Sequence, residues 1–320
     1  MMKQPIEKEL ASYSALFHSS VSYDDGLLSH ALEHVRKRVG KQMRPILILL
    51  MAKNCGSVSD VTINGAVGLE LLHTASLIHD DVVDESAVRR GQPSVNAEYD
   101  NKVAVLVGDF LLSTALHHIA ITGSIAIAEI FAELGRTLAA GELLQLSNIQ
   151  NGSFSEEVYY KVIRQKTAAL FEACAAVGAL SAGASDDTCA LARQFGQNLG
   201  IIFQIRDDIF DYFDSDKIGK PTGNDMTEGK LTLPVLHALN TTNDASMIQI
   251  AEKVKRHEVE KGEILQLVNF TKNNGGIEYA ERSMRSFAVK CEQFIDTNVS
   301  NPDIASALTA YLQFVINRNI

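Results

Sequence analysis

The stretch HTASLIHDDVVD, residues 73–84, gives the clearest indication of the fold. Apolar residues recur at helical spacing in and just before it, at Leu71, Leu72, Ala75 and Ile78. They predict a helix with one apolar stripe. Asp80 and Asp84 lie four positions apart at its end, where they repel each other and the helix dipole disfavours them. The pattern indicates either a Mg²⁺ site, which removes that repulsion, or a solvated acidic helix end.

A second aspartate pattern lies 127 positions downstream, from 207 minus 80. In GIIFQIRDDIFD, residues 200–211, an apolar helical run again ends in aspartates, at Asp207, Asp208 and Asp211. Mg²⁺ takes one or two carboxylates and completes its shell with water and phosphate oxygens. Two facing clusters can therefore hold several Mg²⁺ ions around one diphosphate. The repetition favours this interpretation over a solvated helix end.

The composition favours an all-α protein. Of 320 residues, 46% are hydrophobic and only 6 are proline. No uninterrupted apolar run approaches the roughly 18 residues of a membrane span, so we expect no stable membrane insertion. The first residues lack the apolar core of a signal peptide, which predicts a cytoplasmic location. We expect a single domain over residues 1–320, in which residues 1–25 form an N-terminal cover or interface segment.

The charge and the cysteines exclude other classes of protein. Lys plus Arg is 29 and Asp plus Glu is 39, which gives a net charge of −10 and argues against nucleic acid as a partner. An anionic ligand must then be held by local basic residues and metal ions. The 4 cysteines form no CxxC pair, so neither a zinc site nor a disulfide framework is indicated.

Basic residues lie at the positions where an anion is expected. Lys41 and Arg44 flank the predicted start of a buried helix, and Pro45 suits its first turn. Backbone N–H groups at a helix N-terminus favour an anion, although an isolated basic pair is more often solvated surface. Arg89 and Arg90 follow the first motif, and their planar guanidinium groups suit phosphate oxygens.

Further lysines lie in the second half of the chain. Lys166 precedes small residues on an otherwise apolar helix face, and is either a snorkelling lysine or an anion contact. Residues 214–230 are the most loop-like segment, rich in glycine and alternating charge. A long loop beside a site is often a lid, from which Lys220 and Lys230 could reach a diphosphate.

These motifs together resemble the all-trans polyprenyl diphosphate synthases, in particular the bacterial octaprenyl and other long-chain enzymes. The resemblance covers nearly all of residues 27–235 and rests on GKQMRP, HTASLIHDDVVDESAVRRG, GDF, KTAALF, GIIFQIRDDIFD, GKPTGND and GKLTLP. It implies an antiparallel helical bundle around a deep central cavity, and a homodimer. It also implies Mg²⁺-dependent, head-to-tail condensation of isopentenyl diphosphate onto an allylic diphosphate.

The resemblance also implies roles for individual residues. Up to three Mg²⁺ ions would be held by catalytic aspartates, namely Asp80, Asp81, Asp84, Asp207, Asp208 and Asp211, with Asp80, Asp84, Asp207 and Asp211 as direct ligands. Isopentenyl diphosphate would be bound by Lys41, Arg44, His73 and Arg90. The allylic diphosphate would be bound by Arg89, Lys166, Thr167, Gln204, Lys220 and Lys230, and Lys166 would also act in catalysis. Gln42, where many relatives have a basic residue, and a single C-terminal Arg318 depart from the pattern.

The product length is predicted from the residues one turn before Asp80. Ala75 and Ser76 are small, whereas relatives that make short products carry bulky aromatic residues there as a floor. We therefore expect a long product of about C30–C50, of the kind used in quinone side chains. The alternatives are small residues that merely pack helices, and a farnesyl or geranylgeranyl diphosphate synthase.

Other classes of protein share parts of this pattern. A class I terpene cyclase or a head-to-head condensing enzyme also combines helices with aspartate motifs, but usually has an asymmetric second motif. A non-catalytic subunit of a heteromeric synthase would be expected to have lost one motif or its basic residues. This chain has lost neither.

Overall fold

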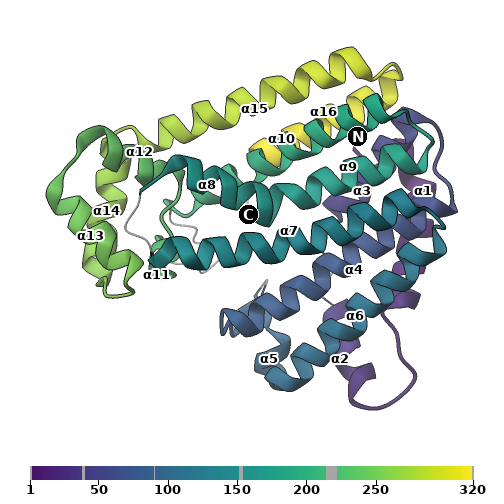
Figure 1. The fold of residues 1–320 in the computed structure, drawn as a ribbon, viewed down its shortest axis with the longest axis horizontal. Helices are drawn as coiled ribbons and strands as arrows, with labels where there is room; N and C mark the ends of the chain where they lie inside the picture. The colour runs from purple at the N-terminus through teal and green to yellow at the C-terminus, as the bar shows by residue number, and fades with distance from the viewer. Residues whose placement is uncertain (1, 38–39, 90, 151–153, 214–221, 319–320) are drawn as a thin grey trace. The chain divides into compact units, whose positions relative to one another are not determined.

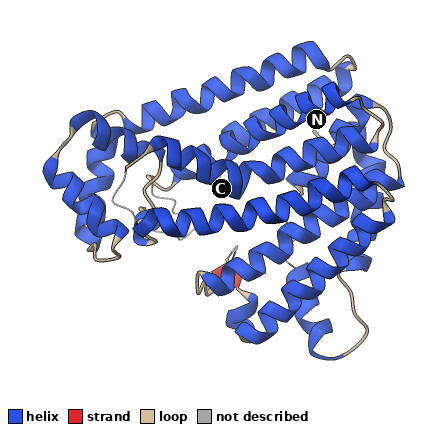
Figure 2. Cartoon of the chain, viewed as in Figure 1, coloured by secondary structure: helices blue, strands red, loops and turns tan. Residues whose placement is uncertain are grey.

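The computed structural model describes residues 2–37, 40–89, 91–150, 154–213 and 222–318. Almost all regular structure in them is helical (Figure 2), which confirms the all-α prediction. The described strands are the two-residue β1 (Val88–Arg89) and β2 (Gln92–Pro93), which pair antiparallel with Val88 opposite Pro93. So short a ribbon has no periodicity that the sequence could show.

The chain divides into two compact units. Unit 1 comprises Met1–Gly135, Leu170–Gly196 and Ile295–Ala310, and unit 2 comprises Arg136–Ala169, Gln197–Phe294 and Tyr311–Ile320. Several helices contribute residues to both units, namely α7 (Ile125–Gln150), α9 (Ala169–Ser181), α10 (Asp186–Phe210), α15 (Gly276–Asn298) and α16 (Pro302–Asn317). The expectation of a single domain stays a prediction.

Unit 1 contains the N-terminal helices of the chain, labelled in Figure 1. Its further elements are the 3₁₀ turn η1 (Gln4–Ile6), α1 (Glu7–Ser20), α2 (Gly26–Arg36), α3 (Met43–Cys55), α4 (Asp60–Val83), α5 (Val95–Glu98) and α6 (Asn101–Ile121). Helices α4 and α6 lie side by side. The predicted apolar stripe of α4 is buried, with Leu71 and Ile78 0% and 4% exposed.

The centre of unit 1 is α3, whose residues 46–52 are all 0% exposed. Gly178 on α9 lies so close to it that an added Cβ would stand 2.5 Å from the carbonyl oxygen of Ile48. The Ala- and Gly-rich sequence of α9 therefore packs closely, as expected. The N-terminal segment covers α3 and α4 through buried Ile6, Leu10 and Tyr13.

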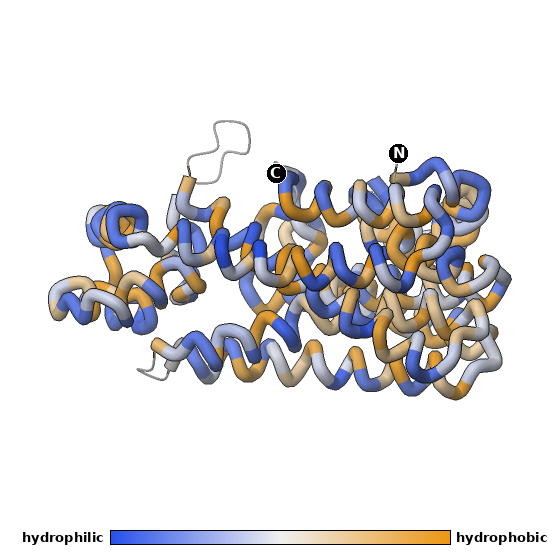
Figure 3. The backbone as a smooth tube through the Cα atoms, turned by 90° about the horizontal axis from the view of Figure 1, so that it is seen from above, coloured by the Kyte–Doolittle hydropathy of each residue, from blue (hydrophilic) through white to orange (hydrophobic). Residues whose placement is uncertain are grey.

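Unit 2 contains the shorter helices of the second half. Its further elements are α8 (Glu156–Ile163), a π-helical segment η2 (Arg164–Ala168), α11 (Asn224–Thr227), α12 (Leu233–Thr242), α13 (Ala245–Lys255) and α14 (Lys261–Asn273). Ser155 caps α8, as expected, by accepting a hydrogen bond from the backbone N–H of Val158 over 3.3 Å. Hydrophobic and hydrophilic residues alternate along the helices (Figure 3), the pattern of amphipathic helices that bury one face.

Helices α4 and α6 are long and apolar enough to cross a membrane by length and composition alone. Their most apolar 18-residue windows have mean hydropathies of 1.3 and 1.6, and 61% and 39% of these windows are buried within the protein. Core helices of soluble proteins meet the same criterion, so this is weak evidence. The absence of membrane insertion and the cytoplasmic location stay predictions.

Candidate active site

The first aspartate motif lies at the C-terminal end of α4 in unit 1. Asp80 is half-buried and Asp84, the C-cap residue, is exposed. Between them Asp81 is 1% exposed and is bound by Arg89, whose Nε and Nη2 lie 2.8 and 2.5 Å from its Oδ1. Asn96 donates to the carbonyl oxygen of Asp81 over 3.2 Å. The ribbon and α5 thus fix the middle aspartate and leave the outer two as the accessible pair.

Arg89 was predicted to bind the allylic diphosphate, and the structure places it on Asp81. Its side chain is still 31% exposed, so part of the guanidinium faces solvent while the rest compensates the buried carboxylate. Arg90, predicted for isopentenyl diphosphate, lies outside the described residues.

The GDF motif on α6 supports the motif-bearing end of α4. An added Cβ on Gly108 would lie 2.2 Å from Nε2 of His79, so only glycine leaves room for this imidazole. The same nitrogen is 3.2 Å from the carbonyl oxygen of Val105 and 3.5 Å from Oδ1 of Asp109. His79 therefore joins α4 to α6 immediately before Asp80. Asp109, whose role the sequence left open, pairs with it.

The residues predicted to set the product length lie on different faces of α4. Ser76 precedes Asp80 by one turn and, like His73, is half-buried. Ala75 lies five positions before Asp80, which turns the helix by about 500°, so it is about 140° away from the aspartate. It is 1% exposed, on the same side as the apolar stripe. Ala75 and Ser76 therefore lie on different sides of α4, and their role in setting the product length stays a prediction.

Lys41 and Arg44 lie at the start of α3, as predicted. Gln42 adopts a left-handed conformation with φ 56° and is the N-cap residue. Lys41 is exposed, whereas the half-buried guanidinium of Arg44 lies 5.8 Å from the ring centroid of Phe171. Nε of Arg44 is buried without a hydrogen-bond partner in the described part of the chain. The geometry suits an anion at this helix start.

The second aspartate motif lies in unit 2, at the end of α10, and each of its aspartates has a different kind of partner. Asp207 forms an ion pair with Arg318. Asp208 accepts hydrogen bonds from Tyr159 and Gln204, over 2.5 and 2.8 Å. Asp211 accepts two backbone N–H groups at the start of α11, over 2.9 and 3.1 Å. The two motifs thus share a sequence pattern, but their aspartates have different partners.

The middle aspartate has a strongly altered acidity. Burial, with Asp208 2% exposed, raises its pKa to about 7, and the neighbouring Asp207 and Asp211 carboxylates raise it as well. The hydrogen bonds from Tyr159 and Gln204 lower the pKa and so favour the ionised form. The charge of Asp208 therefore depends on its burial and on these two donors, and its predicted catalytic role stays a prediction.

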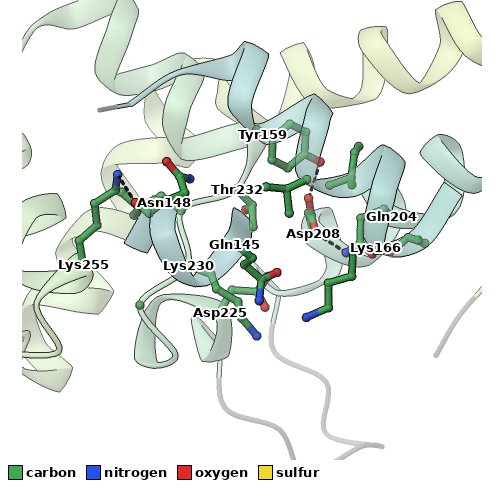
Figure 4. Close-up of a pocket in the computed structure, with 15 residues that line it drawn as sticks. Gln145, Asn148, Tyr159, Lys166, Gln204, Asp208, Asp225, Lys230, Thr232 and Lys255 are labelled. Atoms are coloured by element: carbon green, nitrogen blue, oxygen red, sulfur yellow. Dashed lines mark hydrogen bonds between the residues drawn. The ribbon is translucent and has the colours of Figure 1, made fainter. Parts of the chain in front are cut away.

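A pocket of about 160 Å³ opens beside this motif, entirely within unit 2. Figure 4 shows Asp208 joined to Tyr159 and Gln204 at its edge. The cationic side chains of the lining are Lys166, Lys230 and Lys255, and its other polar side chains are Gln145, Asn148, Tyr159, Thr167, Gln204, Asp208, Asp225 and Thr232. Four of the predicted substrate-binding residues, Lys166, Thr167, Gln204 and Lys230, line the pocket together. Lys220, the fifth of this group in unit 2, lies outside the described residues.

Two of the predicted lysines are paired with carboxylates in the structure. Nζ of Lys166 lies 2.5 Å from Oε2 of Glu142, and Nζ of Lys230 lies 2.5 Å from Oε2 of Glu228. Lys166 and Thr167 belong to the π-helical segment, a local widening that often accompanies functional sites. Thr167 donates to Oε1 of Gln204 over 2.7 Å and so links this segment to α10.

Sequence reasoning missed several residues of the pocket. Tyr159 is 49 positions from Asp208, and no local pattern predicts their contact. Lys255 is 7% exposed, donates to the carbonyl oxygen of Asn148 over 3.1 Å, and lies 5.3 Å from the Phe154 ring centroid. Burial lowers the pKa of Lys255. In sequence it is an ordinary lysine at the end of an amphipathic helix.

The carboxylates suit a metal ion that completes its coordination shell with oxygen atoms of a bound ligand. Among the described residues, no three His, Cys, Asp or Glu side chains converge closely enough to hold a metal ion by themselves. Mg²⁺ does not require such a cage, since it uses one or two carboxylates with water and phosphate oxygens. Asp80 and Asp84 on one helix face, and the partly exposed Asp207, meet that requirement. The number of ions stays a prediction.

Comparison with known proteins identifies the family. The polyprenyl synthetase family model matches residues 25–271, more than half of the chain, so this protein belongs to the polyprenyl synthetase family. Octaprenyl diphosphate synthase of Escherichia coli (strain K12) is 37% identical to it over 247 residues, which cover 76% of each chain. The protein is thus a prenyltransferase that elongates trans-prenyl chains.

Solved structures agree on the fold. The geranylgeranyl pyrophosphate synthase from Bacteroides thetaiotaomicron is 51% identical with a TM-score of 0.88, over 99% of this chain and 98% of that one. The polyprenyl synthase from Caulobacter crescentus CB15, complexed with calcium and isoprenyl diphosphate, is 31% identical with a TM-score of 0.92, over 100% and 97%. The fold is the isoprenoid synthase fold, and members of the family depend on divalent metal ions.

Proposed function

We propose that this protein uses Mg²⁺ to add isopentenyl diphosphate repeatedly to an allylic diphosphate, and that its product is a long chain of about C30–C50. Family membership supports isoprenyl diphosphates as substrates. The observation that carries the long product is the small, half-buried Ser76 one turn before Asp80, where a bulky residue would stop chain growth. The 37% identical octaprenyl diphosphate synthase agrees with this length.

The residues of the pocket have a clear task in such a reaction. Cleavage of the allylic C–O bond leaves a carbocation and a diphosphate whose negative charge grows. Lys166 and Lys230 line the pocket, and we expect them to stabilise that charge, because fixed cations in a partly dry site interact with it more strongly than cations in water. Bound Mg²⁺ would supply Lewis-acid stabilisation of the same charge. Thr167 and Gln204 hold each other and keep the pocket wall in place.

The carboxylates that now pair with the lysines are also part of the proposal. Glu142 pairs with Lys166 and Glu228 pairs with Lys230, so both ammonium groups are held by a carboxylate before a diphosphate is bound. A diphosphate carries more charge than one carboxylate and competes for each ammonium group. We assign no side-chain base to the final deprotonation, since the released diphosphate lies near enough to accept the proton.

A C20 product is the second candidate, because the solved structure that is 51% identical is a geranylgeranyl pyrophosphate synthase. Mass analysis of the extracted products separates the two. The purified protein is incubated with Mg²⁺, isopentenyl diphosphate and an allylic primer. A chain of about six or more isoprene units supports the long-chain proposal. A product that ends at C15 or C20 keeps the enzyme class and refutes the proposed length.

We also propose that the protein is a homodimer and that α6 contributes to the interface. Val105, Leu106 and Leu116 lie along one side of this helix and are 40%, 66% and 52% exposed. Exposed large apolar side chains are what a second copy would cover. Sedimentation of Leu106→Glu and Leu116→Glu tests this. Both should shift the protein to monomer, and an unchanged sedimentation coefficient for both would refute the role of α6.

A further inference from the structure

Arg318, close to the end of the chain, is bound to the helix that carries the second aspartate motif. Its guanidinium forms an ion pair with Oδ1 of Asp207, and Nη2 donates to the carbonyl oxygen of Phe203 over 3.0 Å. The guanidinium carbon lies 3.6 Å from the ring centroid of Phe203. Phe203 and Asp207 are one turn apart on α10, so a single arginine spans both positions.

The contacts of Arg318 hold its guanidinium in one position, unlike the contacts of an exposed ion pair. Its side chain is 12% exposed, and it combines a charge pair, a carbonyl bond and a stacked ring. Exposed ion pairs contribute little because both partners must be ordered. Here the ring and the carbonyl group order the guanidinium. Nε of Arg318 is buried without a hydrogen bond within the described residues, which shows that the placement is set by its other contacts.

Asp207 differs from the other two aspartates of the motif in having one oxygen available. Tyr159 and Gln204 use both oxygens of Asp208, and two backbone N–H groups use both oxygens of Asp211. In the described part of the chain, Arg318 is the partner of Asp207 and takes Oδ1 alone. The Asp207 side chain is 39% exposed, and Arg318 does not use Oδ2, so this oxygen is the one left for a ligand.

We propose that Arg318 is a positioning residue for the metal ion: it holds Oδ1 of Asp207 so that Oδ2 is presented to a divalent cation. A residue that binds one oxygen of a metal-ligating carboxylate fixes the rotamer of that carboxylate. Loss of such a residue typically weakens metal binding 10- to 100-fold. The inference rests on the proposed Mg²⁺-dependent function. It assigns Arg318 to the metal site, whereas a C-terminal arginine that binds diphosphate would contact substrate.

Calorimetric titration of Mg²⁺ into the full-length protein with inorganic diphosphate measures this directly. Arg318→Ala should weaken Mg²⁺ binding by about tenfold. Arg318→Lys keeps the charge without the planar stack and should recover part of the affinity. Arg285→Ala is the matched control, because Arg285 is exposed on α15, and it should bind Mg²⁺ like the wild type.

A second variant acts through the ring beneath the guanidinium. Phe203→Leu leaves the backbone carbonyl group and both charges, and it should weaken Mg²⁺ binding less than Arg318→Ala does. If Arg318→Ala were to perturb the chain terminus, Phe203→Leu would still test the inference. Thermal unfolding of each variant without metal checks the fold.

Kinetics and Mg²⁺ binding together distinguish the positioning role of Arg318 from two others, a contact to the substrate and exclusion of the metal ion. At saturating Mg²⁺ the KM for isopentenyl diphosphate should match the wild type. Unchanged Mg²⁺ binding with a raised KM would make Arg318 a substrate contact and overturn the proposal. Tighter Mg²⁺ binding in Arg318→Ala would also overturn it, since Arg318 would then exclude the metal. If wild-type protein binds Mg²⁺ and diphosphate in an Arg318-dependent way but elongates nothing, the proposed function fails and this inference stands.

Discussion

Tyr159 donates its hydroxyl hydrogen to Oδ2 of Asp208 over 2.5 Å, at a position where the carboxyl group is 2% exposed. Burial raises the pKa of Asp208 to about 7, and this hydrogen bond lowers it. The charge of the central aspartate of the second motif therefore depends on a residue from α8. The same contact fixes α8 to α10 beside the pocket.

Tyr159→Phe should destabilise the metal-free protein more at pH 8 than at pH 5. The folded pKa of Asp208 is raised above its unfolded value, so its contribution to stability is present below about pH 4 and is lost as pH rises through about 7. Without the donor the ionised form is less favoured, and the loss at high pH grows. We expect about 1–3 kcal/mol at pH 8, from denaturant unfolding. An equal loss at both pH values would contradict this.

Gly108→Ala should lower stability by about 1–3 kcal/mol, because the new methyl group collides with the His79 imidazole and overpacks the contact between α4 and α6. Thermal unfolding measures the change. Gly135→Ala is the control, since a Cβ there meets no atom within 4 Å. In a helix that exchange should be neutral or stabilising. Similar losses in both variants would show that the approach of His79 to Gly108 is not the cause.

Because of His118, the protein should be less stable in weak acid than at neutral pH. The ring is buried between Ser20 and Asn64, at 2.7 and 2.8 Å, and burial lowers its pKa. With a folded pKa below the unfolded value of about 6.5, the unfolded chain takes up a proton first as pH falls. Stability therefore falls below about pH 6.5 and levels off below the folded pKa.

The difference in unfolding free energy between wild type and His118→Gln, measured from pH 8 to pH 5, isolates this contribution. The advantage of the wild type should shrink as pH falls, since the glutamine does not titrate. His117→Gln, at the exposed neighbouring position on α6, is the control. A wild-type advantage that is independent of pH would contradict the account of His118.

Ser76→Phe should shorten the product, as mass analysis would show, and Ala75→Phe tests whether the neighbouring residue on the buried side of α4 also limits the product length. Ser76 lies on the Asp80 side of α4 and is half-buried, so a ring there can block the growing chain with little change in stability. Ala75 is 1% exposed, and a ring there must displace its neighbours at a cost of about 1–3 kcal/mol. If neither variant changes the product distribution, the floor of the cavity lies elsewhere.

The sequence predicted the all-α fold and the helices that carry the two aspartate motifs, because those depend on composition and local periodicity. It also predicted that Lys166, Thr167, Gln204 and Lys230 bind one diphosphate; these four line one pocket, and their role stays a prediction. It could not predict partners that the fold brings from far away. The contacts of Asp208 with Tyr159 and of Asp207 with Arg318 are of this kind, since neither partner carries a local signal.

The sequence does not decide which helix face meets the growing chain. Two residues next to each other differ by about 100° on a helix, so the roles of Ala75 and Ser76 both stay predictions. The ribbon of residues 88–93 was missed because it is too short to show a period of two. This error lies in the supporting structure, while the aspartates lie on the helices where they were expected.

The measurement that tests the central claim most directly is elongation by this chain alone, with and without divalent metal. Purified protein is given isopentenyl diphosphate and an allylic primer, in Mg²⁺ or in excess chelator, and extracted products are weighed by mass spectrometry. The account predicts products that grow in five-carbon steps with Mg²⁺ and none with chelator. Folded protein that elongates nothing in Mg²⁺, or elongates equally well in chelator, would contradict it.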